Sequence, residues 1–68
     1  MNNNIKNKLS LILGKNITII VDVGRNKYDK YKGKILSLYD NIWLFESNNI
    51  LMSFSYSDII SNFVIINP

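Results

Sequence analysis

The chain has 68 residues, a net charge of +3 and a pI near 9.3, and it contains neither Cys nor His. These counts exclude a disulfide framework, a zinc ribbon and a thiol nucleophile, and they remove the commonest general base and metal ligand. Because 47% of the residues are hydrophobic, a dense core can hold this small chain together. Composition therefore predicts a single domain spanning residues 1–68, with no catalytic residue, no metal and no cofactor.

The first predicted element is a short amphipathic helix over residues 5–13. Its apolar side chains recur at helical spacing and form one stripe: Ile5, Leu9, Ile12 and Leu13. Asn4 suits the N-cap position, and Gly14 suits a left-handed C-cap. Nine residues are too few to form a stable helix in water alone, so the stripe should pack against the rest of the domain.

Beyond residue 16 the apolar period changes to two, which is typical of strands. β-Branched residues alternate from Ile17 to Val23, and turn residues follow at 24–26. Four more strand segments are expected, and each is bounded by turn residues: 31–39, 42–46, 50–54 and 63–66. Gly33, inside the second strand, predicts a bulge or a sharp bend.

One helical turn is predicted over residues 58–61, with Ser57 or Asp58 as its N-cap. Five short antiparallel strands cannot form a wide sandwich, but they can bend into a small, partly open barrel. A helical turn before the last strand is common in SH3-like barrels. The expected fold is therefore mostly β: a small five-stranded SH3-like (Sm-like) barrel over 16–66, preceded by a short N-terminal α-helix.

Aromatic residues on the predicted strands are the candidate core. Four of them are expected to be buried: Trp43, Phe45, Phe54 and Phe63. Tyr39 and Tyr56 are expected to be half-buried, with their hydroxyl groups at the rim of the barrel.

The clearest polar feature is the segment from Arg25 to Lys34, which holds five of the eight basic residues, two Tyr and one acid. Cations can neutralise phosphates while aromatic rings stack on bases, as a nucleic-acid site requires. The alternative is a solvated ribbon whose lysines discourage edge-to-edge pairing. Arg25 could bind a carboxylate or phosphate in a bidentate manner, or pair locally with Asp22 or Asp29.

A second polar cluster, Phe54-Ser55-Tyr56-Ser57-Asp58, precedes the last strand. A nucleophilic Ser55 or Ser57 would need a neighbouring base, and the chain has no His. Helix capping is therefore the favoured role of this cluster.

Several short motifs occur in a specific order: Ile5-Lys6-x-x-Leu9, Leu13-Gly14-Lys15, Gly24-Arg25-x-Lys27, Lys32-Gly33-x-Ile35, Tyr39, Ile42-x-x-Phe45 and Ser53-Phe54-Ser55-Tyr56-Ser57-Asp58. With these motifs the chain resembles, over nearly its whole length, the Veg family of small cytoplasmic proteins, also called biofilm formation stimulators. The hairpin at 47–49 is tighter than the longer acidic loop expected of that family.

The resemblance implies an N-terminal helix followed by an SH3-like barrel. It also implies a regulatory role in biofilm matrix expression, exerted by weakening a DNA-binding repressor rather than by catalysis. The family supplies no catalytic residues to carry over. Its recurrent polar positions fall on five residues of this chain: Arg25, Lys27, Lys32, Tyr56 and Asp58.

The leading hypothesis is a non-enzymatic regulatory protein that binds a protein partner, such as a transcriptional repressor. The candidate partner-binding residues are Arg25, Lys27, Lys30, Lys32, Tyr56 and Asp58. The alternative is a nucleic-acid-binding barrel that uses the basic hairpin over 25–34.

Location and assembly are also predicted from the sequence. The chain shows no signal-peptide pattern, and no segment approaches the ~20 apolar residues of a membrane span, so a cytoplasmic protein without membrane contact is expected. A short apolar chain with open sheet edges has surplus apolar surface to cover, which predicts a homodimer.

Overall fold

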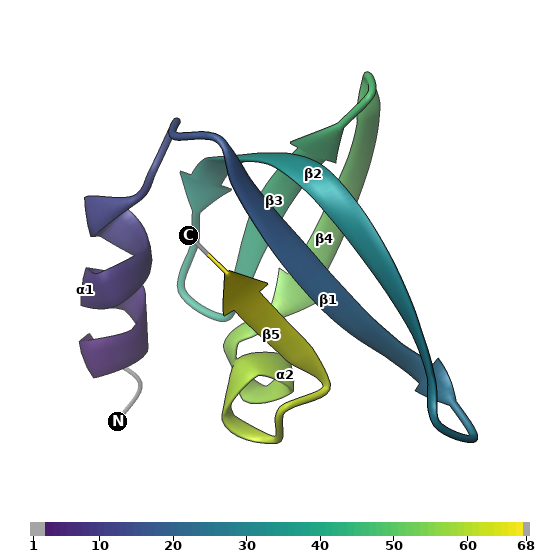
Figure 1. The fold of residues 1–68 in the computed structure, drawn as a ribbon. Coiled ribbons are helices and arrows are strands. Elements are labelled where there is room, and N and C mark those ends of the chain that lie inside the picture. Colours follow the sequence, from purple (N-terminus) through teal and green to yellow (C-terminus); the bar gives the residue numbers. More distant parts are fainter. Residues whose placement is uncertain (1–2, 68) are drawn as a thin grey trace.

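The computed structural model describes residues 3–67 as one antiparallel sheet with two short helices (Figure 1). The elements in chain order are α1 (Asn3–Leu11), β1 (Ile17–Gly24), β2 (Lys27–Leu38), β3 (Ile42–Ser47), β4 (Ile50–Ser55), α2 (Tyr56–Ile60) and β5 (Val64–Asn67). The strand order is β4-β3-β2-β1-β5. The predicted class, mostly β with five strands after a short helix, is confirmed.

Strand β2 is long enough to pair with two different neighbours, and it curves over the sheet as it does so (Figure 1). Its pairing with β1 ends at Gly33, and its pairing with β3 begins at Lys34. A Cβ atom on Gly33 would lie 1.9 Å from the carbonyl oxygen of Glu46, so only glycine permits this close approach. The bulge lies further on, where the register with β3 shifts between Ile35 and Ser37.

The β1–β2 and β3–β4 hairpins each turn through two consecutive residues in the left-handed region. Arg25 and Asn26 have φ values of 49° and 61°, and Asn48 and Asn49 have values of 53° and 65°. Two such residues match the twist of the flanking strands, which is why Asn is favoured at these positions. The turns predicted at 24–26 and 47–49 are confirmed.

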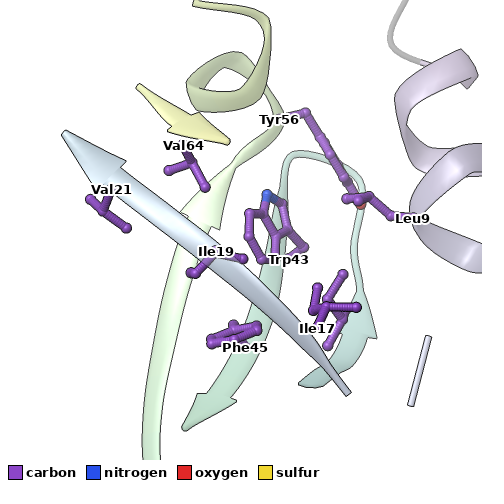
Figure 2. Close-up of a cluster of buried hydrophobic side chains, with 9 residues drawn as sticks. Leu9, Ile17, Ile19, Val21, Trp43, Phe45, Tyr56 and Val64 are labelled. Carbon is purple, nitrogen blue, oxygen red and sulfur yellow. The ribbon is translucent and has the colours of Figure 1, made fainter. Parts of the chain in front are cut away.

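The core lies between the two halves of the bent sheet, with Trp43 near its centre (Figure 2). Nine residues are buried there: Leu9, Ile17, Ile19, Val21, Ile35, Trp43, Phe45, Tyr56 and Val64. The alternation predicted along β1 is confirmed, because Ile17, Ile19 and Val21 all point inward. The Trp43 ring packs edge-on to Phe45 with a centroid separation of 6.3 Å.

The prediction of an aromatic core is right for Trp43 and Phe45 and wrong for Phe63. Phe63 precedes β5 rather than lying in it, and it is 47% exposed. Phe54 is only half-buried, although its ring centroid lies 5.0 Å from that of Trp43. The two tyrosine predictions are also wrong, since Tyr56 is 1% exposed and Tyr39 is 51% exposed.

Helix α1 begins and ends two residues earlier than predicted, and this changes the role of its flanking residues. Asn4 lies within the helix and is not its N-cap, while Leu13 follows the helix end and is exposed. Leu9 is the buried member of the predicted stripe. Gly14 adopts the predicted left-handed conformation with φ of 78°, but its N–H donates to the carbonyl of Ile35 on β2.

Helix α2 spans Tyr56–Ile60 rather than 58–61, and its N-cap is Ser55, not Ser57 or Asp58. The Ser55 hydroxyl accepts from the backbone N–H of Asp58 at 3.3 Å, and the Asp58 carboxylate accepts from the backbone N–H of Ser55 at 3.1 Å. This reciprocal pair is a capping box, which satisfies two backbone donors at once. The capping role assigned to this cluster is therefore confirmed, with a different residue as the cap.

Candidate binding surface

The side chains of the β1–β2 hairpin divide between two faces of the sheet. Ile19 is buried and pairs with Tyr31, so the odd-numbered residues of β2 share the face that leads into the core. The even-numbered residues therefore point outward. We call this outward set the basic face, and it consists of Tyr28, Lys30, Lys32 and Lys34.

Pairing across β2, β1 and β5 places defined neighbours beside these lysines. Thr18 on β1 lies between Lys32 and Asn67, because it pairs with both. Ile20 lies in the same way between Lys30 and Ile65. A shallow depression of about 440 Å³ opens at the Lys32 end, lined by Asn16, Ile17, Thr18, Lys32, Gly33 and Asn67. The surface beside the cations is therefore polar at one end and apolar in the middle.

The cations of the hairpin carry no ion pair within residues 3–67, where the one ion pair joins Lys6 to Asp40 at 3.9 Å. A local pair of Arg25 with Asp22 or Asp29, one of the alternatives considered for this residue, does not form. Asp22 Oδ1 accepts instead from the Gly24 N–H at 2.8 Å, and the Asp29 carboxylate accepts from the Tyr31 hydroxyl at 3.4 Å. The positive charge of the hairpin is thus left for solvent or a partner.

Arg25 stands at the tip of the hairpin, fully separate from the core. Its φ of 49° lies in a region that Asn and Gly adopt readily and that other L-residues adopt at a cost of roughly 1–2 kcal/mol. An arginine at this position therefore does not serve the turn. Arg25 is exposed at the turn of the hairpin, so its guanidinium group is available to a partner.

Tyr56 and Asp58 lie in α2, which directly follows β4 and is separate from the β1–β2 hairpin. The Tyr56 hydroxyl donates to the Tyr39 carbonyl, and burial raises the pKa of this phenol above its ordinary value of 10.0, with the nearby charge of Asp40 adding to the effect. Asp58 is engaged in the capping box. With 1% of its surface exposed, Tyr56 has no surface to offer a partner.

The structure therefore brings together only part of the predicted site. Lys30 and Lys32 share the basic face, Arg25 is at its tip, and Lys27 lies on the opposite side of β2. Tyr28 and Lys34 were missed, although the period of two around Lys30 and Lys32 would have found them. Thr18 and Asn67 could not be found without the register between strands.

Residues 3–67 contain no group of three or more acidic side chains positioned to hold a metal ion. Neither α1 nor α2 has the length and apolar character needed to cross a bilayer.

Comparison with known proteins adds one finding. The model of a protein family described as biofilm formation stimulator VEG matches residues 2–67, which is essentially the whole chain. A search of curated proteins finds no match.

Proposed function

The chain belongs to the biofilm formation stimulator VEG family, and from this premise we propose that it is a non-enzymatic cytoplasmic protein that promotes biofilm matrix expression by binding a protein partner. The proposed partner is a DNA-binding transcriptional repressor. By binding it, the protein lowers the affinity of the repressor for its operator DNA. The proposed contact surface is the basic face together with Arg25 at the tip of the hairpin.

The observation that carries this proposal is the set of unpaired cations on one outward face. Lys30 and Lys32 are exposed, point the same way and have no carboxylate partner within residues 3–67. Ile20 and Ile65 lie beside them, so a partner can bury apolar area next to the charges. An acidic surface with a small apolar centre fits this arrangement, and charge complementarity would also speed its association.

Arg25 is proposed to anchor the contact at the far end of the arm. Its planar guanidinium group can bind a carboxylate through two parallel hydrogen bonds, which lysine cannot reproduce. Truncating one partner of a desolvated charge pair costs about 2–5 kcal/mol of binding free energy. Arg25→Lys is therefore expected to lose most of the contribution of this residue while keeping its charge.

A nucleic-acid contact is the second candidate, and it has its own supporting observation. Tyr28, Lys30 and Lys32 alternate along one face at a spacing of roughly 6.8 Å, which is two strand residues. The ring of Tyr28 is 55% exposed and free to stack on a base, while the lysines neutralise phosphates. The polar depression beside Lys32 would seat a further phosphate.

The proposal is tested by the stability of a repressor–operator complex. Labelled operator DNA of a biofilm matrix gene is bound by its purified repressor, and fluorescence anisotropy is followed as the protein is added. The wild-type protein is expected to release the operator DNA from the repressor. The variant Arg25→Ala/Lys30→Ala/Lys32→Ala should fold normally and release none. A matched control, Lys6→Ala/Lys8→Ala/Lys15→Ala, loses the same net charge near α1 and should act as the wild type does.

The same assay separates the two candidates when the repressor is left out. Direct DNA binding by the protein alone, with a log–log salt slope of about −0.7 to −0.9 per phosphate contact, would favour the nucleic-acid function. Release of operator by the triple variant as efficiently as by the wild type would contradict both candidates.

A further inference from the structure

Strand β4 forms one end of the sheet, and no strand within residues 3–67 pairs with its outer side. Natural edge strands are usually protected by charged residues, prolines, bulges or short length. The sequence of β4, Ile50–Ser55, contains no charged residue and no proline, and its register with β3 runs without a shift. Ile50 and Leu51 are 61% and 58% exposed. This edge is open and apolar.

The backbone groups that face outward from β4 follow from its pairing with β3. A two-residue turn makes the residues that flank it, Ser47 and Ile50, a hydrogen-bonded pair. At the other end of the strand, the Tyr56 N–H donates to the Asn41 carbonyl. Because bonded and non-bonded pairs alternate, the N–H and C=O groups of Leu51, Ser53 and Ser55 point away from β3.

Only two of these three residues remain available. The N–H of Ser55 donates to the Asp58 carboxylate, and its C=O accepts from the Trp43 indole at 3.2 Å. The groups of Leu51 and Ser53 have no such partner within residues 3–67. The open part of the edge is therefore centred on Met52.

We propose that two copies of this chain pair antiparallel along β4, about a two-fold axis at Met52. In this register Leu51 of the first copy lies opposite Ser53 of the second copy, and Ser53 of the first copy lies opposite Leu51 of the second. The two open N–H groups and two open C=O groups of each copy are then all satisfied. On the other face of the strand Ile50 lies opposite Phe54, Met52 opposite its own copy, and no like charges meet.

Other registers fit this edge less well. A shift by one residue would place the core-facing side chains of one copy opposite the outward side chains of the other. A shift by two residues would require pairing through either Ser55 or Asn49. The backbone N–H and C=O of Ser55 are already hydrogen-bonded, and Asn49 lies in the turn with φ of 65°. The edge is therefore complementary to itself in one register, which favours a second copy as its occupant.

The size of the contact sets its strength. A six-residue strand is well below the 20–30 residues that each partner contributes to a standard interface, so the dimer should be weak and reversible. The opposite edge of the sheet, β5, has only four residues, and short length is itself a protection against strand addition. The dimer leaves the basic face free, because β3 separates β4 from β2.

Sedimentation velocity from about 5 to about 500 µM tests the proposal, since a dimer must dissociate on dilution. The wild type should change from monomer to dimer across this range. Leu51→Lys/Ser53→Lys should weaken dimerisation at least tenfold, because each new lysine faces a lysine of the second copy. Leu51→Glu/Ser53→Glu should do the same. Both positions are exposed and face outward, so both variants should keep the wild-type circular dichroism spectrum.

A mixture of the two charge variants tests whether positions 51 and 53 of the two copies meet across the contact. An equimolar mixture should dimerise at least as tightly as the wild type, because lysine then faces glutamate across the axis. Ile65→Lys, which adds a charge on β5 at the opposite end of the sheet, is the control and should dimerise as the wild type does. A wild type that stays monomeric, charge variants that dimerise unchanged, or a mixture that stays monomeric would each overturn the proposal.

Discussion

The β1–β2 and β3–β4 hairpins share one turn geometry and differ in almost everything else. Each turns through two residues with positive φ, and each pairs its strands in antiparallel register. The β3–β4 hairpin places Trp43 and Phe45 in the core, with both side chains fully buried. The end of the β1–β2 hairpin extends away from the core as a basic arm (Figure 1).

The difference shows how a small domain can separate stability from binding. The strands near Trp43 bury large apolar side chains and hold the fold together, so substitutions there act on the free energy of unfolding. On this arm, residues 27–30 of β2 are all exposed, so their charges contribute little to stability and are available for recognition. Substitutions in these two hairpins should therefore have separable effects on stability and on binding.

Trp43→Ala should produce the largest change. The side chain is completely buried, and removing so large an aromatic group costs about 3–5 kcal/mol of unfolding free energy, most of what a domain of this size possesses. Urea denaturation followed by circular dichroism measures the loss. Leu44→Ala, on the same strand but only half-buried, is the control and should lose less. A Trp43→Ala variant as stable as the control would contradict the assignment of the core to the β3–β4 side.

Gly33→Ala comes next, because this residue joins the two hairpins. The added methyl group would meet the Glu46 carbonyl, and relieving that clash should cost about 1–3 kcal/mol. Thermal denaturation compares the melting temperatures of Gly33→Ala and Gly24→Ala. In Gly24→Ala nothing lies within 4 Å of the new Cβ atom, and only the φ of 102° is unfavourable. Equal melting temperatures for Gly33→Ala and the wild type would mean that β2 does not approach β3 as closely as described.

Tyr56→Phe should have a smaller effect that depends on pH. Loss of the hydrogen bond to the Tyr39 carbonyl costs about 0.5–1.5 kcal/mol at neutral pH. The pKa of Tyr56 in the folded protein lies above the unfolded value of 10.0, so this stabilisation is fully present below pH 10 and is lost as the pH rises through the folded pKa. Urea unfolding from about pH 8 to about pH 11 should show the two proteins converging at high pH. A difference that does not change with pH would exclude the buried phenol as its cause.

The smallest effect on stability is expected for Arg25→Ala/Lys30→Ala/Lys32→Ala. These exposed side chains have no ion pair within residues 3–67, so the melting temperature should stay within about 3 °C of the wild type. Differential scanning calorimetry measures the shift. A large destabilisation would show that the arm is structural, and it would remove the contrast between the two hairpins.

The parts of the fold that depend on local pattern were predictable from the sequence. The alternation of Ile17, Ile19 and Val21 and the Asn-rich turns identified strands and hairpins, because side-chain period and positive φ are local properties. The ends of α1 and α2 were misplaced by about two residues. Several similar polar residues, such as Ser55 and Ser57, could serve as the N-cap of α2. Ser55 does so because Asp58, three residues later, completes a capping box with it.

The errors in the core and the site came from tertiary packing. Tyr56 looked like a rim residue because of its hydroxyl group, but the carbonyl of Tyr39, 17 residues away, satisfies that group in the interior. Phe63 looked like a core residue because it was predicted to be the first residue of the last strand, yet that strand begins only at Val64. The register that sets Thr18 beside Lys32 involves contacts between distant segments, which composition and period do not specify.

We attribute the function to the basic face and Arg25, and the stability to the rest of the sheet. This claim is tested by biofilm formation in a strain that lacks the chromosomal gene and expresses one variant at the wild-type level. The control Lys6→Ala/Lys8→Ala/Lys15→Ala should restore biofilm, and Arg25→Ala/Lys30→Ala/Lys32→Ala should not. Full restoration by the second variant, with its melting temperature unchanged, would contradict the claim.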